Sequence, residues 1–226
     1  MIRLILFPVF KLYIFFFNGG FLEGIYRRVS FFKPIIQTRD NETPINPKQW
    51  LKFKILGGHS GGAYFPIHPT SKIDGSWRNI VVGIDASPTV SPGCYVGALG
   101  KLEIGDYSQV APHVGILTSN HFMFDIRKHI IKDVVIGKYC RIGMKSIIHP
   151  GVVLGDFVTV AAGSVVKDSF PNGYCVISGN PAIIVEDFSG NQRIMSKFIE
   201  YRNQFEYNGF IPNAEFENYR KQNLNF

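Results

Sequence analysis

The amino-acid sequence predicts an all-β protein, a parallel β-helix built from six-residue repeats. The first observation is a series of large aliphatic residues spaced six apart: Ile136, Ile142, Ile148, Leu154, Val160 and Val166. The second is another small or aliphatic residue two places before each of them: Val134, Cys140, Ser146, Val152, Val158 and Ser164. The third is a glycine or alanine directly after most of the large residues: Gly137, Gly143, Gly155 and Ala161. This period fits neither an α-helix, which repeats at about 3.6 residues, nor an alternating strand.

Each repeat is therefore expected to form one flat face of a coil, with a small residue at the tight corner that follows. Three repeats complete one turn, and stacked turns bury a continuous column of aliphatic side chains. Upstream the step recurs in broken form, with two extra residues before the fourth position: Ile84, Val90, Val96, Ile104, Val110 and Ile116. Ile67 and Ile73 are expected in an incomplete first turn.

The segment between Ile116 and Ile136 interrupts the coil, because residues 117–131 have no clean six-residue register. A repeat array tolerates insertions only at its corners, and such loops often carry function. We therefore expect a loop that leaves the coil here. It holds a dense polar cluster: Asn120, His121, Asp125, Arg127 and His129.

The two ends of the chain lack the repeat, so three parts are expected: residues 1–66, the β-helix at 67–185, and residues 186–226. At the C-terminal end, apolar residues at helical spacing predict an amphipathic helix that covers the last coil: Ile194, Phe198, Tyr201 and Phe205. Residues 208–226 have no clear period and are expected to form a tail or a clasp on a neighbouring subunit.

The N-terminal part is apolar and basic. Residues 1–60 contain nine Lys or Arg against three Asp or Glu, which is +6 of the net charge of +7. The apolar run from Leu4 to Phe17 includes Pro8 and Lys11, and it is shorter than the roughly 20 apolar residues of a spanning helix. Aromatic residues beside dispersed positive charge suggest that residues 1–33 contact a membrane interface. A helix that caps the open end of the coil is the alternative.

Composition limits the classes of protein that fit. Charged residues make up 18% and apolar residues 46% of the 226 residues, which is typical of a folded globular chain. No DNA- or RNA-binding motif accompanies the basic residues, so a nucleic-acid partner is not expected. The three cysteines show no metal-knuckle spacing, and Cys94 and Cys140 occupy the small inward position, where packing is the expected role. A reducing cytoplasm is the expected compartment, either free or at the inner face of the cell membrane.

Further motifs stand at definite points of the repeat region. Ala111-Pro112-His113-Val114 runs on to Thr118-Ser119-Asn120-His121, and residues 162–166 (Ala-Gly-Ser-Val-Val) precede Gly179-Asn180-Pro181-Ala182. With the repeats, these motifs resemble the hexapeptide-repeat acyltransferase superfamily, and within it the galactoside, maltose and surface-polysaccharide O-acetyltransferases. The resemblance covers roughly residues 67–185 and implies a left-handed β-helix.

The resemblance places the catalytic base at His121. Transfer of an acetyl group from a thioester to a sugar hydroxyl requires a base, and histidine titrates close to neutral pH. Asn120 and Asp125 are expected to contact the acceptor sugar or to orient the imidazole, with capping of the loop as the alternative. Arg127 and His129 are interpreted as loop surface. The chain has no Gly-x-Ser-x-Gly motif, so a hydrolase elbow is not expected.

The resemblance also implies acetyl-coenzyme A as acyl donor, bound along the outside of the later coils, and no metal. The residues expected to contact it are Gly143, Met144, Ala162, Gly163, Ser164 and Lys167. Two positions depart from the family pattern. Ile183 stands where Lys or Arg is usual, and Arg193 or Lys197 is the candidate replacement. Arg141 stands where sugar acetyltransferases often have Trp, and it suggests an anionic acceptor that this arginine binds.

The gamma-class carbonic anhydrases are a rival on the same coil, because they hold zinc with three histidines. His113 and His121 are eight residues apart rather than at the close spacing expected for such ligands. The Gly-Asn-Pro-Ala motif also points to acyl transfer, so the acyltransferase interpretation is preferred.

The sequence thus predicts an acetyl-coenzyme A-dependent O-acetyltransferase that modifies a sugar hydroxyl of a surface polysaccharide or its precursor. By resemblance it is a homotrimer in which His121 faces the later coils of a neighbour. The alternatives are an N-acetyltransferase of an amino sugar nucleotide, an antibiotic acetyltransferase, and a non-catalytic β-helix scaffold.

Overall fold

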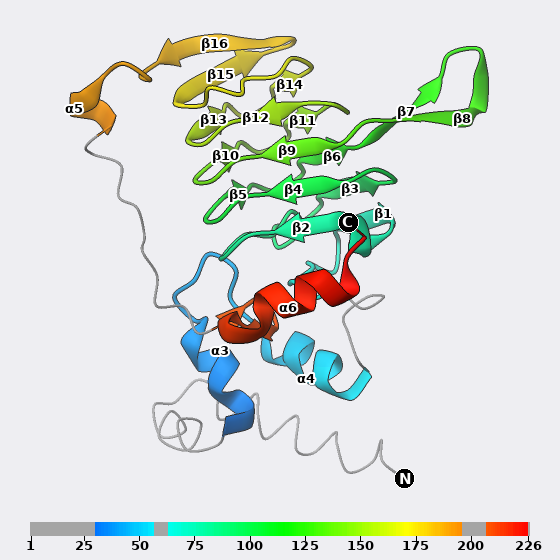
Figure 1. Ribbon diagram of the computed structural model, residues 1–226, viewed down its shortest axis with the longest axis vertical. Coiled ribbons are helices and arrows are strands. Elements are labelled where there is room, and N and C mark those ends of the chain that lie inside the picture. Colours follow the sequence, from blue (N-terminus) through cyan, green and yellow to red (C-terminus); the bar gives the residue numbers. More distant parts are fainter. Residues whose placement is uncertain (1–29, 57–62, 196–206, 226) are drawn as a thin grey trace.

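The structure is a computed structural model that describes residues 30–56, 63–195 and 207–225. Its centre is a triangular coil of short parallel strands with three faces (Figure 1). The first face consists of β1 (Lys72–Gly75), β3 (Tyr95–Ala98), β6 (Gly115–Leu117), β11 (Ile147–Ile148) and β14 (Val165–Val166). The second consists of β2 (Ile80–Val82), β4 (Leu102–Ile104), β9 (Val134–Ile136) and β12 (Val153–Leu154). The third consists of β5 (Gln109–Val110), β10 (Arg141–Ile142), β13 (Val158–Val160), β15 (Cys175–Gly179) and the antiparallel β16 (Ala182–Asp187).

The repeats build the predicted aliphatic column. On the first face, Ile116, Ile148 and Val166 stand in register in neighbouring coils, and each is fully buried. The smaller inward residues are buried as well, among them Cys140 and Ser146 at 0% exposure. Burial of each large side chain stabilises the coil by roughly 1.5–3 kcal/mol. The predicted β-helix is confirmed.

The first coil departs from the predicted register. Val82 pairs with Ile104 and is fully buried, whereas Ile84 and Val90 are only half-buried. The third face has no strand in this coil, because the chain passes from β2 into a loop at residues 84–92. The regular six-residue step therefore begins one turn later than the sequence suggests.

The corner between the second and third faces carries a column of aromatic residues. Tyr107, Tyr139, Phe157 and Tyr174 all have φ between +50° and +60°, a conformation that costs a residue with a Cβ roughly 1–2 kcal/mol. Their ring centroids lie 4.9–5.1 Å apart from coil to coil. Each such pair contributes about 0.5–1.5 kcal/mol, so stacking offsets much of the backbone cost.

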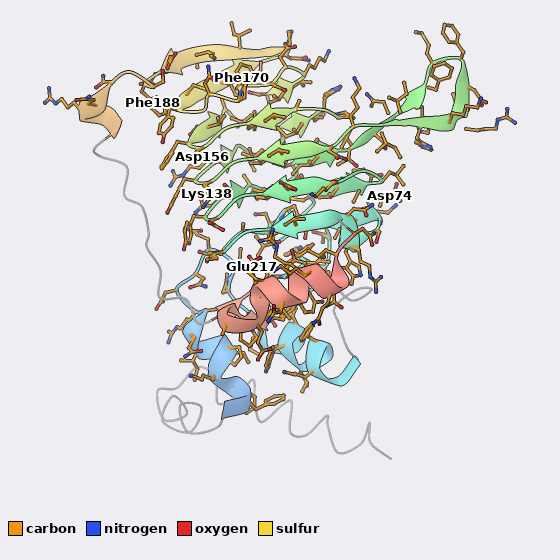
Figure 2. All side chains as sticks on the ribbon, viewed as in Figure 1. Asp74, Lys138, Asp156, Phe170, Phe188 and Glu217 are labelled. Carbon is orange, nitrogen blue, oxygen red and sulfur yellow. The ribbon has the colours of Figure 1, made fainter. Side chains whose placement is uncertain are left out.

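The same corner carries alternating charge. The Lys138 ammonium lies 3.0 Å from the carboxylate of Asp106, in the coil before it. The Lys138 backbone N–H donates to the carboxylate of Asp156, in the coil after it, at 2.7 Å. Figure 2 shows Lys138 and Asp156 one above the other along this edge. These contacts tie three successive coils together.

The N-terminal arm packs under the first coil. It contains η1 (Ser30–Phe32), α3 (Lys33–Gln37) and α4 (Pro47–Leu56). The Asn46 side chain accepts from the Lys48 N–H at 2.8 Å and so caps the start of α4. The predicted membrane contact of residues 1–33 lies largely outside the described residues and stays a prediction. Within the described part of the chain, no helix has both the length and the apolar character needed to cross a membrane.

The C-terminal part of the chain packs against the first coil, a contact that the sequence did not indicate. Three elements follow the repeats: β17 (Tyr207–Asn208), β18 (Ile211–Pro212) and α6 (Asn213–Asn223). The first coil, to which this part returns, also contains a short 3-10 helix, η2 (Trp77–Asn79). In α6, Phe216 is buried with its ring centroid 5.8 Å from that of Tyr64. The segment expected to form a tail or a clasp on a neighbouring subunit is therefore largely a helix that covers the first coil of its own chain (Figure 1). Of the helix predicted around residues 194–205, only α5 (Gln192–Met195) is described.

Candidate active site

The predicted polar loop is a β-hairpin that projects from the corner between the first and second faces (Figure 1). It consists of β7 (Ser119–Phe122) and β8 (Asp125–Ile131), paired antiparallel. His121 lies directly opposite His129, and their ring centroids are 4.5 Å apart. Residues opposite each other in an antiparallel pair share one face. The two imidazoles therefore form a pair on one side of the hairpin.

The geometry of His121 determines its tautomer. Its Nδ1 lies 2.7 Å from the carbonyl oxygen of Ile126. A carbonyl oxygen only accepts hydrogen bonds, so in the neutral ring Nδ1 carries the proton. Nε2 is then the nitrogen with a free lone pair. His121 is exposed, so Nε2 is positioned to accept a proton from a substrate held beside the hairpin.

The base of the hairpin is anchored by Thr118, which is fully buried. Its hydroxyl donates to the Gly97 carbonyl at 2.7 Å and accepts from the Gly100 N–H at 2.8 Å. Its backbone carbonyl accepts from the Lys132 N–H at 2.9 Å, where the chain returns to the coil. One residue thus fixes both the exit and the return of the strand pair that carries His121.

The predicted neighbours of His121 are differently placed. Asn120 pairs with Ile130, and because successive side chains in a strand alternate, it lies on the other face from His121. Asp125 forms a bidentate ion pair with Arg127, at 2.9 and 3.1 Å. This guanidinium lowers the pKa of Asp125 below its ordinary value. The described contact that orients the His121 ring is the Ile126 carbonyl.

The hairpin also exposes apolar side chains. Met123 is 81% exposed, Phe124 82% and Ile126 74%. Exposed apolar side chains in such a group are typical of interaction surfaces. The tip of the hairpin is therefore a surface suited to contact with another molecule.

Four of the six predicted cofactor residues, Gly143, Met144, Ala162 and Gly163, meet at the corner between the third and first faces. The Gly163 N–H donates to the Met144 carbonyl at 2.9 Å, which joins the two corners. An added Cβ at Gly143 would lie 2.5 Å from the Ala162 nitrogen, so only glycine permits this approach. Met144 is 44% exposed, Ala162 is exposed, and Gly163 faces open space. This corner presents backbone and small side chains on its outside.

Ser164 and Lys167 are not on the outside of that corner. The Ser164 side chain is buried and accepts from the Gly179 N–H at 3.3 Å, while its carbonyl accepts from Ile147 at 2.8 Å. Ser164 therefore supports the corner from inside. Lys167 follows β14 at the opposite edge of the first face, beside His149. Burial, and then the charge of Lys167, lower the pKa of His149.

Arg141 stands on a different face from the hairpin. It lies on β10 of the third face, in register with Gln109 and Thr159. The hairpin that carries His121 leaves the coil from the corner between the other two faces, and Figure 1 shows β10 and the hairpin on opposite sides of the molecule. The fold thus separates Arg141 from His121 within one chain.

The histidines considered as zinc ligands do not come together. His113 occupies a corner between the third and first faces with φ +61°, against Gly93. Among the described residues, no three His, Cys, Asp or Glu side chains form a group that could hold a metal ion.

Two residues of this site were not predicted as functional. Thr118 stands in the motif that runs to His121, but the sequence gave it no role of its own, because its role depends on contacts with Gly97 and Gly100 in the previous coil. His129 was interpreted as loop surface, and the structure places it against His121. The hairpin turn at Met123-Phe124 lacks the Asn or Gly that would have indicated the pairing register.

Comparisons with known proteins agree with this fold. Residues 123–168 match the family described as bacterial transferase hexapeptide (six repeats). The "Putative colanic acid biosynthesis acetyltransferase WcaF" of Escherichia coli K12 is 29% identical over 141 residues, which cover 62% of this chain and 75% of that protein. The "Putative lipopolysaccharide biosynthesis O-acetyl transferase WbbJ" of the same strain is 27% identical over 139 residues, covering 56% and 70%.

A solved structure has a similar fold. The structure of a galactoside acetyltransferase in complex with coenzyme A matches with a TM-score of 0.55 at 19% identity, covering 86% of this chain and 94% of that one. The fold is a left-handed β-helix of hexapeptide repeats. The chain is thus similar to the bacterial transferase hexapeptide family over residues 123–168, and to two proteins that are named as acetyltransferases.

Proposed function

We propose that the protein is an acetyl-coenzyme A-dependent O-acetyltransferase that acetylates a sugar hydroxyl of a surface polysaccharide or its precursor. The observation that carries this proposal is the hydrogen bond from His121 Nδ1 to the Ile126 carbonyl, because it leaves Nε2 free as a base. The relatives named for colanic acid and lipopolysaccharide biosynthesis support a polysaccharide-related acceptor.

In this mechanism, His121 Nε2 takes the proton of the acceptor hydroxyl while the hydroxyl oxygen attacks the thioester carbonyl carbon. The tetrahedral intermediate then collapses. The carbon–sulfur bond breaks, and the imidazolium returns its proton to the thiolate. The products are a sugar acetate and the free thiol. General-base assistance of this kind is typically worth about 10²- to 10⁴-fold in rate.

The corner between the third and first faces fits the acyl donor. The pantetheine arm needs close access to backbone, and Gly143, Ala162 and Gly163 offer it because none has a side chain beyond Cβ. Met144 lies beside them with an exposed apolar side chain. Lys167 is exposed at the opposite edge of the first face, where it would meet a phosphate of the donor as a point charge rather than contact the pantetheine arm. Ser164 is not among the proposed direct contacts, because its hydroxyl and carbonyl are used within the coil.

We further propose a homotrimer in which the hairpin of one subunit lies against the next. Two observations support it. The hairpin tip exposes Met123, Phe124 and Ile126, and Arg141 lies on a different face from His121. Closed rings bury such surfaces without leaving open edges. Each site would then combine His121 of one subunit with the later coils of another. Size-exclusion chromatography with light scattering would test the trimer by measuring the molar mass of the protein in solution.

The proposed reaction is tested by the release of free thiol from acetyl-coenzyme A across a panel of glycan and amino-sugar acceptors. Wild type and His121→Ala are compared, with His68→Gln as a matched histidine change outside the hairpin. We expect acceptor-dependent release that falls at least about 10²-fold in His121→Ala and is unchanged in His68→Gln. Undiminished release in His121→Ala would remove His121 from the mechanism, and exclusive use of amine acceptors would replace O-acetylation with N-acetylation.

A further inference from the structure

A cavity of about 300 Å³ lies on the outside of the third face, where the N-terminal arm meets the coil. Its floor is a row of outward residues in register across β5, β10 and β13: Gln109, Arg141 and Thr159. Its rim comes from the arm, through Glu42 and Thr43, and from the loop of the first coil that replaces a third-face strand. The cavity exists because the first coil is irregular.

The rim is held rigidly. Asp85 accepts hydrogen bonds from the Glu42 N–H at 3.1 Å, the Thr43 N–H at 2.9 Å and the Thr43 hydroxyl at 2.7 Å. In the same loop, the Ser91 hydroxyl donates to the Val110 carbonyl of β5 at 2.6 Å. These contacts join arm, loop and third face. The cavity is therefore a preformed feature of the fold.

The charges around the cavity select a ligand. Arg141 is exposed, and within the described ranges 30–56, 63–195 and 207–225 no carboxylate pairs with it. A guanidinium binds a carboxylate or phosphate through two parallel hydrogen bonds. Gln109 and Thr159 beside it offer an amide and a hydroxyl, which suit sugar hydroxyls.

Glu42 narrows the class of ligand further. Two acidic residues line the cavity that Arg141 serves with one positive charge. The carboxylate of Asp85 is engaged by the Glu42 N–H and by Thr43, and the other carboxylate is that of Glu42. This carboxylate would repel a polyanion such as a nucleotide diphosphate, whereas a sugar hydroxyl would donate a hydrogen bond to it. The volume is at the lower end of the roughly 300–1,000 Å³ of small-molecule sites. A single sugar ring with one acidic group satisfies all of these conditions.

We propose that this cavity binds an acidic sugar residue of the acceptor glycan, with its carboxylate on Arg141 and its hydroxyls on Gln109, Thr159 and Glu42. The proposal rests on the proposed acyl transfer to a glycan and names the acceptor class. It assigns a binding role to Gln109, Thr159 and Glu42, which no sequence motif indicated.

The test is direct binding of sodium D-glucuronate to the full-length protein by isothermal titration calorimetry. D-glucose serves as the uncharged match and inorganic phosphate as the anion without a sugar. The variants are Arg141→Gln, Arg141→Lys and Glu42→Gln, with Lys221→Gln as a charge control on α6. Arg141 is exposed, so these variants are expected to fold, and circular dichroism confirms it.

We expect saturable binding of glucuronate and at least about tenfold weaker binding of glucose, because a charge-assisted bidentate pair exceeds the 1.4 kcal/mol of one tenfold step. Arg141→Gln should bind glucuronate at least about tenfold more weakly than wild type, and Arg141→Lys should lose less affinity. Lys221→Gln should bind glucuronate as tightly as wild type. Glu42→Gln should shift the preference of the cavity from glucuronate toward phosphate, relative to wild type. The absence of glucuronate binding, equal binding by Arg141→Gln, or phosphate binding as tight as glucuronate binding in wild type would overturn the proposal.

Thiol release from acetyl-coenzyme A separates this proposal from the proposed function. Glucuronate binding that depends on Arg141, without acyl transfer to any acceptor, would support the cavity and reject the transferase activity. Acyl transfer to neutral glycans, without glucuronate binding, would support the activity and reject the cavity.

Discussion

The hydroxyl of Thr118 lies 2.7 Å from the carbonyl oxygen of Gly97 and 2.8 Å from the backbone nitrogen of Gly100. Both partners belong to the previous coil, and Thr118 stands three residues before His121. The buried hydroxyl thus joins the base of the hairpin to the previous coil, beside the backbone hydrogen bonds from the Thr118 N–H to the Gly97 carbonyl and from the Lys132 N–H to the Thr118 carbonyl. This contact makes Thr118 a positioning residue for the proposed base.

The first prediction concerns Thr118→Val, which keeps the shape and removes the hydroxyl. The buried Gly100 N–H would lose its acceptor, which costs about 1–3 kcal/mol. We expect a lower midpoint in urea unfolding and a lower kcat, with the KM for acetyl-coenzyme A little changed. Thr118→Ser should retain most of both properties. Equal kcat in the two variants would show that the hydroxyl does not position His121.

A second prediction tests the donor corner. Ala162→Trp places a large side chain on its exposed outside, where the proposed pantetheine arm approaches. The KM for acetyl-coenzyme A should rise at least about tenfold, equivalent to about 1.4 kcal/mol of lost binding. Glu186→Trp puts the same side chain on the exposed strand β16 and should leave this KM unchanged. An unchanged KM in Ala162→Trp would place the donor elsewhere.

A third prediction concerns Asp85, whose carboxylate holds the N-terminal arm through Glu42 and Thr43. Asp85→Asn keeps one acceptor oxygen and sets an amide donor against a backbone N–H. The loss of one or two buried hydrogen bonds should lower the free energy of unfolding by about 1–3 kcal/mol, measured by urea denaturation. Asp168→Asn, an exposed change at another corner, should be neutral. Equal stability of the two variants would show that the arm is held by other contacts.

A fourth prediction concerns thiol reactivity. Cys94, Cys140 and Cys175 are free and buried, at 0–2% exposure. Burial raises the pKa of all three thiols, that of Cys140 to about 12. At pH 8 the native protein should therefore react slowly with a thiol reagent such as dithionitrobenzoate, and three thiols should react at once in denaturant. A fast-reacting thiol in the native state would show that a coil opens locally.

Much of the fold follows from short-range pattern. Because each six-residue repeat forms one face, spacing alone placed Ile142, Ile148 and Leu154 in the column. It also located the insertion that carries His121. A break in the six-residue period can be seen in the sequence as clearly as the period itself. The resemblance to the acyltransferases then identified His121 as the candidate base. The first coil was harder, because Ile84 and Val90 have the right spacing but the chain forms a loop there.

The site depended on contacts that spacing does not encode. The pairing of His121 with His129 follows from the register of a hairpin whose turn has no characteristic residues. Arg141 departs from the family pattern in sequence, but only the three-faced coil shows that it lies on another face from His121. The helix α6 was missed because its partners are remote in sequence; Phe216, for example, has its ring centroid 5.8 Å from that of Tyr64.

The sequence by itself determined the coil, its buried column, the place of the insertion and the candidate base. It could do so because a solenoid repeats a local rule, in which each residue's burial depends on its position within its own repeat. The tertiary structure decided the orientation of the His121 ring, the anchoring of the hairpin by Thr118, and the cavity around Arg141. Each of these joins segments from different coils or from the arm, and only the packed chain brings such segments within hydrogen-bonding distance.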